Sequence, residues 1–261
     1  MLLAGGVGNA GQVVRVGNTV RRPWRGSTPA THALLNHLNE VLPGVAPVPL
    51  GRDEQGREVL SWLDGDVGIE PFPQWVAEEE FLVSLGQLLR RIHDALAGWI
   101  APPDLEWSDQ IPDPQGGPLI VHADICPQNV IAKDGRAVSI IDWEFAAPGR
   151  AIWDVVSTAR LCVQFTHPSR REPVYEGLDV DTRLGIFLDA YDLSDPDRAI
   201  FTKVLDERRL AGARFIQGRI DRDEKAFADL WATPEGERRL VLEERWVRER
   251  PADVAEAIRP R

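Results

Sequence analysis

Short apolar runs separated by turn residues fill the first quarter of the chain, whereas longer apolar repeats dominate the remainder. Alternation of apolar and polar positions predicts strands at 13–16, 19–22 and 57–63, with a Gly17–Asn18 turn between the first two. Three prolines in 41–50 limit that stretch to a loop and an edge strand. The pattern therefore predicts a small antiparallel sheet in the first 63 residues.

Helical spacing of apolar residues appears first after Thr28, which we expect to be the N-cap of a helix with Pro29 at its first position. The strongest repeat runs from 78 to 96 and predicts a long amphipathic helix. Further repeats predict helices at 152–163, 184–191, 198–218, 221–231 and 233–248. The expected fold class is therefore α+β, with a small sheet and one helix preceding a mostly helical region.

Two further short strands carry polar residues at their ends. The run 119–121 is followed by His122, Asp124 and Asn129, and the run 138–141 is followed by Asp142. The residues Lys133–Arg136 predict a hairpin turn before the second run. We expect the two carboxylates and the carboxamide to converge at one sheet edge.

This set of side chains suits phosphoryl transfer, which needs an acceptor hydroxyl held in line and a divalent metal on the phosphates. Asp124 can orient the hydroxyl and accept its proton, and Asn129 and Asp142 offer the hard oxygen ligands that Mg²⁺ prefers. The alternative is that these residues only cap strands and tighten turns. The coincidence of four spaced polar residues with two strands favours the catalytic interpretation.

The pattern His-x-Asp-x-x-x-x-Asn, followed by an apolar strand that ends in Asp142–Trp143, resembles the aminoglycoside phosphotransferase family of small-molecule kinases. Pro127 before Asn129 fits the same family. The resemblance implies a protein-kinase-like fold of two lobes, with a nucleotide-binding lobe at 1–63 and a catalytic and substrate-binding lobe at 64–261. It also implies transfer of a phosphoryl group from ATP or GTP to a hydroxyl of a small molecule.

In this resemblance Asp124 is the catalytic base, His122 holds the loop backbone, and Asn129 and Asp142 bind Mg²⁺. A carboxylate at Asp154, near the start of its helix, can brace the catalytic loop.

Three glycines near the start, Gly6, Gly8 and Gly11, form a Gly-x-Gly-x-x-Gly pattern. Alone this pattern is weak, and a glycine-rich hairpin is the simpler alternative. In the resemblance, a glycine loop between strands covers the nucleotide phosphates with backbone N–H groups.

The chain departs from the family at the phosphate-binding lysine, because Arg22 occupies its position. Arg22 shares a strand face with Val20, and a guanidinium can clamp phosphate bidentately, although Arg21 remains an alternative. The family also places a glutamate on the following helix. The equivalent positions here are Thr31 and His32, so we expect that ion pair to be missing.

The strand that ends near 63 corresponds to the last strand of the small lobe and the hinge. The resemblance implies that backbone groups of Ser61, Trp62 and Leu63 bind the adenine edge, and the alternative is a plain sheet strand.

The composition limits the kinds of molecule that the chain is expected to bind. The formal net charge is −11, which argues against nucleic acid. Acidic side chains gather in the Pro- and Asp-rich loop at 101–117, at Asp104, Glu106, Asp109 and Asp113, so we expect a cationic or amine-bearing acceptor. Two cysteines are too few for a disulfide scaffold. No signal peptide or membrane span is evident, which favours a cytoplasmic protein.

Two other functions stay open. A pseudokinase that binds nucleotide or a partner without turnover is favoured by the missing Lys–Glu pair, but it has no need for Asp124, Asn129 and Asp142 together. A protein kinase is disfavoured because Asp142 and Asp154 are only 12 positions apart (154 − 142), which leaves no room for a long activation segment. Aminoglycosides, other antibiotics, choline-like alcohols and sugars all remain candidate acceptors.

Overall fold

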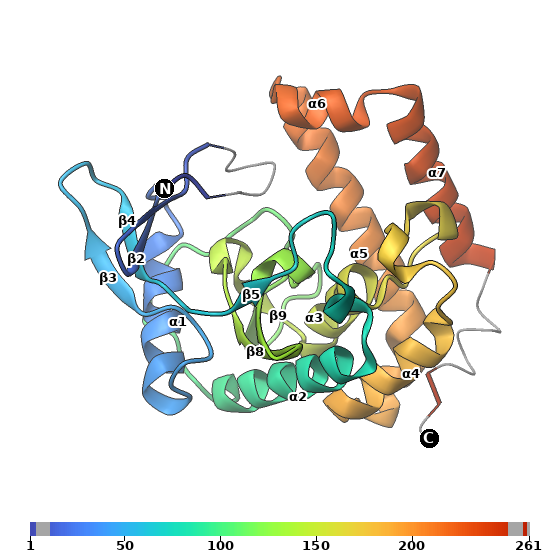
Figure 1. Cartoon of the computed structure of the whole chain (residues 1–261), viewed down its shortest axis with the longest axis horizontal. Helices are drawn as coiled ribbons and strands as arrows, with labels where there is room; N and C mark the ends of the chain where they lie inside the picture. The colour runs from blue at the N-terminus through green and yellow to red at the C-terminus, as the bar shows by residue number, and fades with distance from the viewer. Residues whose placement is uncertain (4–10, 250–257, 260–261) are drawn as a thin grey trace.

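The structure is a computed structural model that describes residues 1–3, 11–249 and 258–259. Gly6 and Gly8 of the predicted phosphate loop lie outside the described residues, as does most of the expected C-terminal tail. Figure 1 shows a small sheet with one helix at one end of the molecule and a larger, mostly helical part at the other. The predicted α+β fold class, with a small sheet and one helix before a mostly helical part, is confirmed.

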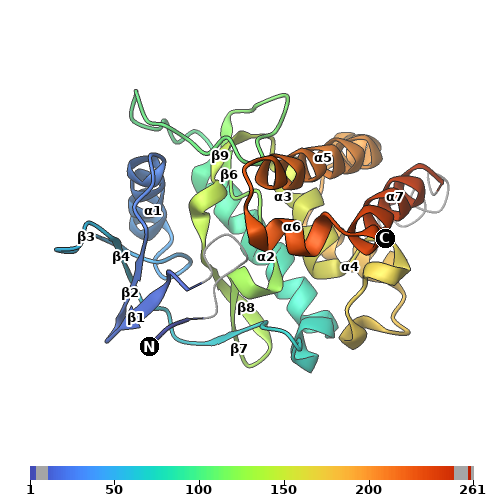
Figure 2. The same cartoon turned by 90° about the horizontal axis from the view of Figure 1, so that it is seen from above.

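The small sheet is antiparallel and has the strand order β1-β2-β4-β3. Its strands are β1 (Val14–Val16), β2 (Thr19–Arg22), β3 (Pro49–Arg52) and β4 (Glu58–Ser61). The helix α1 (Thr28–Val41) lies beside the sheet (Figures 1 and 2). It begins one residue earlier than predicted, with Ser27 as N-cap, because the Thr28 hydroxyl accepts the Arg25 N–H (2.9 Å) instead of capping the helix.

The larger part is built from helices that match the predicted apolar repeats closely. They are α2 (Glu79–Leu96), α3 (Ala151–Thr158), α4 (Val180–Tyr191), α5 (Asp195–Asp221), α6 (Lys225–Trp231) and α7 (Pro234–Glu249). A π-helical turn, Ala159–Val163, extends α3 to the end of the predicted helix. The apolar face of α2 is fully buried and forms the centre of the core, with Phe81, Leu85 and Ile92 each at most 1% exposed. Within the described residues, no helix combines the length and apolarity needed to cross a membrane.

The strands around the predicted catalytic residues belong to two separate small sheets. One sheet has the order β5-β7-β8, from β5 (Asp66–Val67), β7 (Val130–Lys133) and β8 (Arg136–Ile140). The other pairs β6 (Leu119–Val121) with β9 (Ala147–Gly149). The expectation of a single shared sheet edge is therefore wrong, because the 3₁₀ turn Pro127–Asn129 carries the chain from one sheet to the other.

The hairpin between β7 and β8 turns at Asp134–Gly135, as predicted. Both residues have positive φ (51° and 74°), which is the backbone of a type I′ turn and suits an Asp-Gly pair.

Hydrogen bonds join the small sheet region to the larger part. The segment after α1 meets β8, where the Ile140 N–H donates to the Val45 carbonyl (2.8 Å) and the Ser139 hydroxyl donates to the Gly44 carbonyl (2.7 Å). The strand β8 leads directly to Asp142, so this contact fixes the small sheet relative to the predicted metal-binding residue.

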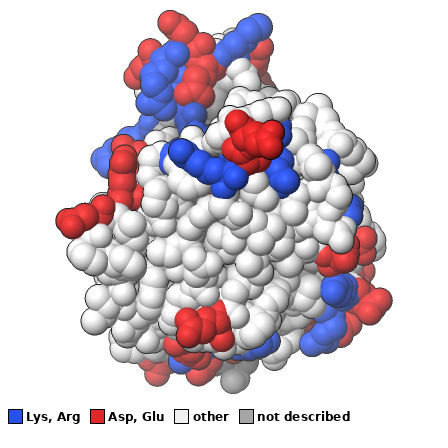
Figure 3. All heavy atoms as spheres, turned by 90° about the vertical axis from the view of Figure 1, so that its left-hand side faces the viewer, with Lys and Arg blue, Asp and Glu red and all other residues white. Residues whose placement is uncertain are grey.

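One side of the molecule, the left-hand side of Figure 1, has a broad uncharged area. Figure 3 shows basic and acidic side chains mixed around it and no extended basic patch on this side. This face offers no electrostatic footprint for a nucleic acid.

The contact between α2 and α4 is so close at Gly86 that it provides a test of the packing. A Cβ at Gly86 would lie 2.9 Å from the Ala190 Cβ and from the Phe187 carbonyl oxygen. We predict that Gly86→Ala lowers the free energy of unfolding by about 1–3 kcal/mol, the usual cost of overpacking. Urea unfolding followed by circular dichroism measures this.

The matched control is Gly218→Ala, also within a helix, where the nearest atom is Arg222 Nη1 at an ordinary 3.6 Å. It should stabilise by about 0.5–1 kcal/mol through helix propensity. Equal effects of the two substitutions would contradict close helix packing at Gly86.

Candidate active site

The loop after β6 is held by a carboxylate from α3. The backbone N–H groups of His122 and Ala123 donate to the two Asp154 oxygens at 2.7 and 2.6 Å. His93 of α2 contacts the same carboxylate through Nε2 (3.2 Å), and its Nδ1 lies 2.7 Å from the Tyr191 hydroxyl. Asp154 therefore braces the catalytic loop, as the sequence indicated.

The environment of Asp154 keeps its carboxylate ionised. Burial alone would raise its pKa, but the hydrogen bond and charge of His93 and the interactions with His122 lower the pKa below its usual value. The contact with Asp154 makes His93 part of the support of the loop.

A buried arginine from α5 supports the same loop from the other side. Arg208 donates through Nη2 to the Ala123 carbonyl (3.1 Å) and through Nε to the Ser157 hydroxyl (2.8 Å), which itself donates to the Ala123 carbonyl (2.9 Å). Ala123 has φ +66°, a left-handed backbone that is costly for a residue with a Cβ. These hydrogen bonds, with Asp154, hold Ala123 in that conformation.

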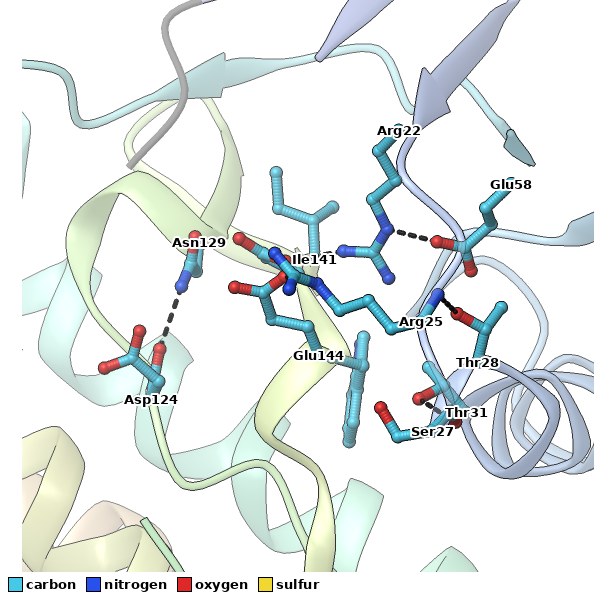
Figure 4. A network of polar contacts seen from close by, with 12 residues as sticks. Arg22, Arg25, Ser27, Thr28, Thr31, Glu58, Asp124, Asn129, Ile141 and Glu144 are labelled. Atoms are coloured by element: carbon cyan, nitrogen blue, oxygen red, sulfur yellow. Dashed lines mark hydrogen bonds and ion pairs between the residues drawn. The ribbon is translucent and has the colours of Figure 1, made fainter. Parts of the chain in front are cut away.

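Asp124 follows directly and presents its carboxylate at the end of the braced loop. Burial raises the pKa of Asp124, and the positive charge of Arg208 opposes that increase. The backbone of Asp124, rather than its carboxylate, makes the loop contacts: its N–H donates to His122 Nδ1 (3.2 Å), and its carbonyl accepts from Asn129 Nδ2 (2.9 Å, Figure 4).

His122 bridges the catalytic loop and the segment after β8. Its Nε2 lies 2.9 Å from the Ile141 carbonyl, and its ring packs against Trp143 with centroids 4.7 Å apart. Because Nδ1 accepts the Asp124 N–H, the hydrogen-bond network assigns the proton to Nε2 and makes the ring neutral. Burial lowers the pKa of His122, which agrees with the neutral form. Through these contacts His122 links the backbone at Asp124 to the backbone at Ile141.

Asn129 and Asp142 form the candidate metal site. The Ile141 N–H donates to the Asn129 carbonyl (2.8 Å), so Asp142 follows immediately after a residue bonded to Asn129. The Asn129 amide nitrogen is held by Asp124, which leaves its side-chain oxygen for a ligand. Asp142 adopts a left-handed backbone (φ +62°), and its side chain is 32% exposed.

The donor set of this pair fits Mg²⁺. One carboxylate and one amide oxygen are hard ligands, and Mg²⁺ usually completes its shell with phosphates and water. Among the described residues there is no group of three or more His, Cys, Asp or Glu side chains that could hold a metal ion. The pair therefore fits a metal shared with a nucleotide rather than a site enclosed by protein ligands.

Arg22 faces this site, and Arg21 does not. Arg22 Nη1 lies 2.6 Å from Asp142 Oδ1. Arg21 contacts the Thr19 hydroxyl (2.5 Å) and Asp53 (3.5 Å) on the other side of β2. The geometry favours Arg22 of the two arginines as the phosphate ligand.

The expected glutamate on α1 is absent, with Thr31 and His32 at its position, but Arg22 has a carboxylate partner from a strand. Arg22 Nε is hydrogen-bonded to Glu58, which is opposite it in the β2–β4 register. The pattern of alternating residues in the two strands could have indicated Glu58, but only once their register was known.

A second arginine from the small sheet region enters the site. Arg25 Nε lies 3.2 Å from Glu144 Oε2, two residues after Asp142. In Figure 4 the side chains of Arg25 and Glu144 lie between the Asp124–Asn129 pair and Arg22. No pattern in the sequence around Arg25 distinguishes it from the other arginines, and it was not predicted.

The predicted nucleotide-binding residues are distributed along the small sheet. Gly11, the one described glycine of the Gly-x-Gly-x-x-Gly pattern, has φ +77° and precedes β1. Val20 is half-buried opposite Leu60.

The N–H groups at the predicted hinge are largely in use. Ser61 donates to the Val48 carbonyl and Trp62 to the Asn18 carbonyl, each at 2.9 Å. The Trp62 ring also stacks under the Arg15 guanidinium (3.8 Å). Leu63, the third predicted hinge residue, makes no backbone hydrogen bond to another described residue and keeps its N–H available for a ligand.

A pocket of about 300 Å³ adjoins Glu144 and is formed by the 101–117 loop, Arg25–Ser27 and the end of α5. Its charged lining residues are Arg25, Glu106, Asp109, Glu144, Arg219 and Arg222. Arg219 and Arg222 pair with Glu224 (2.9 and 3.3 Å). Within the described part of the chain, Glu106 and Asp109 form no ion pair.

The four acidic residues of the 101–117 loop are not equivalent. Asp113 is buried and bound by Arg150 through two hydrogen bonds (2.7 and 2.8 Å), so it does not line the pocket. Asp104 is exposed and also lies outside the pocket lining. Glu106 and Asp109 are therefore the two acidic residues of this loop that the structure brings to the site.

The fold and the arrangement of Asp124, Asn129, Asp142 and Arg22 around one junction define the class: a phosphotransferase of the protein-kinase-like fold. Residues 104–198 match the family model described as the phosphotransferase enzyme family. The chain is 34% identical over 204 residues to the trifolitoxin immunity protein of Rhizobium leguminosarum bv. trifolii, covering 74% of this chain and 75% of that protein.

Solved structures agree on the fold. An amicoumacin kinase solved with AMP-PNP and Ca²⁺ has a TM-score of 0.65 at 12% identity, covering 93% of this chain and 89% of that one. A GDP complex of aminoglycoside 2′-phosphotransferase-IIIa has a TM-score of 0.59 at 12% identity, covering 93% and 91%. A choline/ethanolamine kinase family protein from Mesorhizobium loti has a TM-score of 0.55 at 16% identity, covering 89% of each chain.

The chain belongs to the phosphotransferase enzyme family, and it is a phosphotransferase of the small-molecule kinase type. The family resemblance predicted from the catalytic motif is confirmed.

Asp154 supplies a test of how the catalytic loop is held. We predict that Asp154→Ala lowers the free energy of unfolding by about 2–6 kcal/mol, because two buried N–H groups lose their acceptor at about 1–3 kcal/mol each. Urea unfolding at neutral pH measures the loss. Asp124→Asn is the control, since the Asp124 carboxylate makes no loop contact, and it should unfold like the wild type.

The pH dependence gives a second check on Asp154. Its folded-state pKa is lowered, so its stabilisation is complete above the unfolded-state pKa of about 4 and is lost as pH falls through the folded-state value. The stability difference between wild type and Asp154→Ala should therefore narrow in acid. A difference that does not change with pH would mean that the ionised carboxylate does not hold the loop.

Proposed function

We propose that this chain transfers the terminal phosphoryl group of ATP or GTP to a hydroxyl of an amine-bearing antibiotic or toxin. The observation that supports this most directly is Asp124, held at the end of a loop braced by Asp154 and Arg208, beside the Asn129–Asp142 pair. That arrangement is what in-line transfer to a hydroxyl requires.

The residues divide the reaction between them. The acceptor oxygen forms a bond to the terminal phosphorus while the bond from that phosphorus to the leaving nucleoside diphosphate breaks, and the hydroxyl proton passes to Asp124. Asn129 and Asp142 would hold Mg²⁺, which neutralises phosphate charge when bound. Arg22 binds the donor phosphates, and His122 keeps the loop in register with Asp142.

The donor nucleotide is assigned to the small sheet region. We propose that residues 1–63 form the nucleotide-binding lobe and 64–261 the catalytic and substrate-binding lobe. Gly6, Gly8 and Gly11 would cover the phosphates, and the Leu63 N–H is the hinge donor with Ser61 and Trp62 offering carbonyls. Val20 would line the base or ribose from the sheet.

The acceptor class rests on the pocket beside Glu144. The arginines that line it are paired with Glu144 or Glu224, whereas Glu106 and Asp109 have no ion pair in the described chain. An amine would find two carboxylates there that form no ion pair in the described chain, although three arginines also line the pocket. The immunity protein that shares 34% identity is named for protection against a toxin, which supports inactivation of a toxic small molecule as the biological role.

A pseudokinase is the second candidate. The ion pair between Arg22 and Asp142 (2.6 Å) favours a pseudokinase. In this pair the proposed phosphate ligand and the proposed metal ligand bind each other instead of a nucleotide and a metal ion. Nucleotide binding without turnover of any acceptor would support this alternative.

The acceptor is identified by nucleotide consumption against a panel of amine-bearing, neutral and anionic hydroxyl compounds, each with and without Mg²⁺. We predict that the best acceptor carries an amine and that its KM rises with salt, because exposed charge pairs are screened. In Glu106→Gln/Asp109→Asn, KM for that acceptor should rise by about 2- to 30-fold, from about 0.2–1 kcal/mol for each of the two exposed pairs.

Asp104→Asn is the matched control, because Asp104 lies on the same loop outside the pocket, and it should leave KM unchanged. If the best acceptor is neutral or anionic and its KM does not change with salt, the proposal of an amine-bearing acceptor is wrong.

Substitutions of Asp124 and Asp142 should affect nucleotide affinity and turnover differently. We predict that Asp142→Ala removes Mg²⁺-dependent nucleotide affinity and turnover together. Asp124→Asn keeps the shape of the side chain, so nucleotide affinity and thermal stability should stay near wild type. Its turnover should fall by about 10²–10⁴-fold, the usual contribution of a positioned base.

Calorimetric titration with Mg²⁺·nucleotide and a rate assay on both variants make this measurement. Wild-type turnover in Asp124→Asn would show that Asp124 is not the base.

A further inference from the structure

The guanidinium of Arg22 is held from behind by Glu58. Glu58 is 1% exposed and Arg22 is 8% exposed, and the two residues face each other directly in the β2–β4 register. Arg22 Nε is hydrogen-bonded to Glu58 Oε2. A buried carboxylate needs compensation for the water it loses. Arg22 supplies part of that compensation through this hydrogen bond, and the same bond orients the Arg22 guanidinium.

The second oxygen of Glu58 is bound by His32 of α1. His32 Nε2 lies 2.9 Å from Glu58 Oε1, so each carboxylate oxygen has its own partner. Burial alone would raise the pKa of Glu58, but the hydrogen bonds from His32 and Arg22 lower it, which keeps the carboxylate charged.

His32 is itself fixed by the surrounding rings. The Trp24 ring meets the His32 ring edge-on, with centroids 5.3 Å apart, and the Arg52 guanidinium stacks on Trp24 at 3.7 Å. These contacts connect α1, the segment before it and β3. They leave Glu58 little freedom to follow Arg22 if Arg22 moves.

The arrangement decides where the free side of Arg22 points. With Nε held by Glu58, Nη1 is the nitrogen that reaches Asp142 Oδ1. Figure 4 shows Glu58 on the far side of Arg22 from the Asn129 side chain. Because Arg22 already contacts Asp142 at 2.6 Å, loss of Glu58 would remove the contact that fixes Nε toward the sheet, and the direction of the guanidinium would no longer be set from both sides.

We propose that Glu58, held by His32, is the positioning residue that keeps Arg22 aimed at the donor phosphates. This rests on the proposed function, in which Arg22 binds those phosphates. The carboxylate that orients the phosphate ligand is therefore placed on strand β4, and the helix α1 contributes a histidine that supports it.

The test is a double-mutant cycle of Glu58→Gln, Arg22→Ala and the double variant, with affinities for Mg²⁺·ATP and for adenosine measured by calorimetry. Glu58→Gln keeps the shape and removes the charge. It should weaken Mg²⁺·ATP binding by about tenfold, within the range for a charged hydrogen bond, and leave adenosine affinity unchanged. In the Arg22→Ala background, Glu58→Gln should have no further effect, because it acts through Arg22.

Two further variants separate positioning from folding. His32→Phe keeps a ring against Trp24 but removes the hydrogen bond to Glu58, and it should weaken Mg²⁺·ATP in the same direction by a smaller factor. Asp53→Asn is the matched control, because it neutralises the partner of Arg21 on the other face of the same strand, and it should bind both ligands like the wild type.

Several results would overturn the inference. An unchanged Mg²⁺·ATP affinity in Glu58→Gln, fully additive losses in the cycle, or equal losses for adenosine and Mg²⁺·ATP would each show that Glu58 does not act through Arg22 on the phosphates. Absence of Mg²⁺·ATP binding by the wild type would remove the proposed function and this inference together. Mg²⁺·ATP binding without turnover of any acceptor would remove only the proposed function, because the cycle is read from binding.

Discussion

The buried carboxylate of Asp154 is the interaction on which the site depends. It accepts the N–H groups of two successive loop residues and contacts His93, which in turn contacts Tyr191. The catalytic loop is thereby tied to α2, α3 and α4 at one point in the core. Because a charged group in the interior is tolerated only when its hydrogen bonds are complete, the loop and the helix core specify each other's positions.

Charged contacts across the junction perform a different task. Arg22 reaches Asp142 and Arg25 reaches Glu144, so two arginines of the small sheet region contact the two acidic residues that follow β8. Both pairs are partly exposed and lie where a nucleotide would bring phosphate charge. If Arg22 binds the donor phosphates as proposed, a bound triphosphate would compete with Asp142 for Arg22 and so would alter a contact between the two parts of the molecule.

The sequence predicted the parts of the site that are local in the chain. The spacing of His122, Asp124 and Asn129 and the strands on either side follow from patterns within about 25 residues, and the structure places them as a unit. Glu58 and Arg208 could not be found in this way. One depends on the register of two strands separated by a helix, and the other on how a helix 85 residues further on packs against the loop.

The same limit explains one error and one omission about the arrangement. The single sheet edge was wrong, and the partner of Arg22 on β4 was not found, because each strand was interpreted alone. Pairing determines which side chains share a face, and pairing is decided by contacts between distant segments.

Arg22 stands where the family resemblance implies a lysine, and its carboxylate partner Glu58 stands on a strand where the resemblance implies a helix. An ammonium is a point charge, whereas a guanidinium is a planar fork with donors on two sides. Arg22 uses Nε toward Glu58 behind it and Nη1 toward Asp142 in front of it. A lysine could satisfy both carboxylates only by lying between them. The fork allows Glu58 to sit on the neighbouring strand, in direct register, while the other end of the same side chain still reaches the site. On α1, where the resemblance implies an acid near Thr31 and His32, His32 instead forms a hydrogen bond with the second oxygen of Glu58.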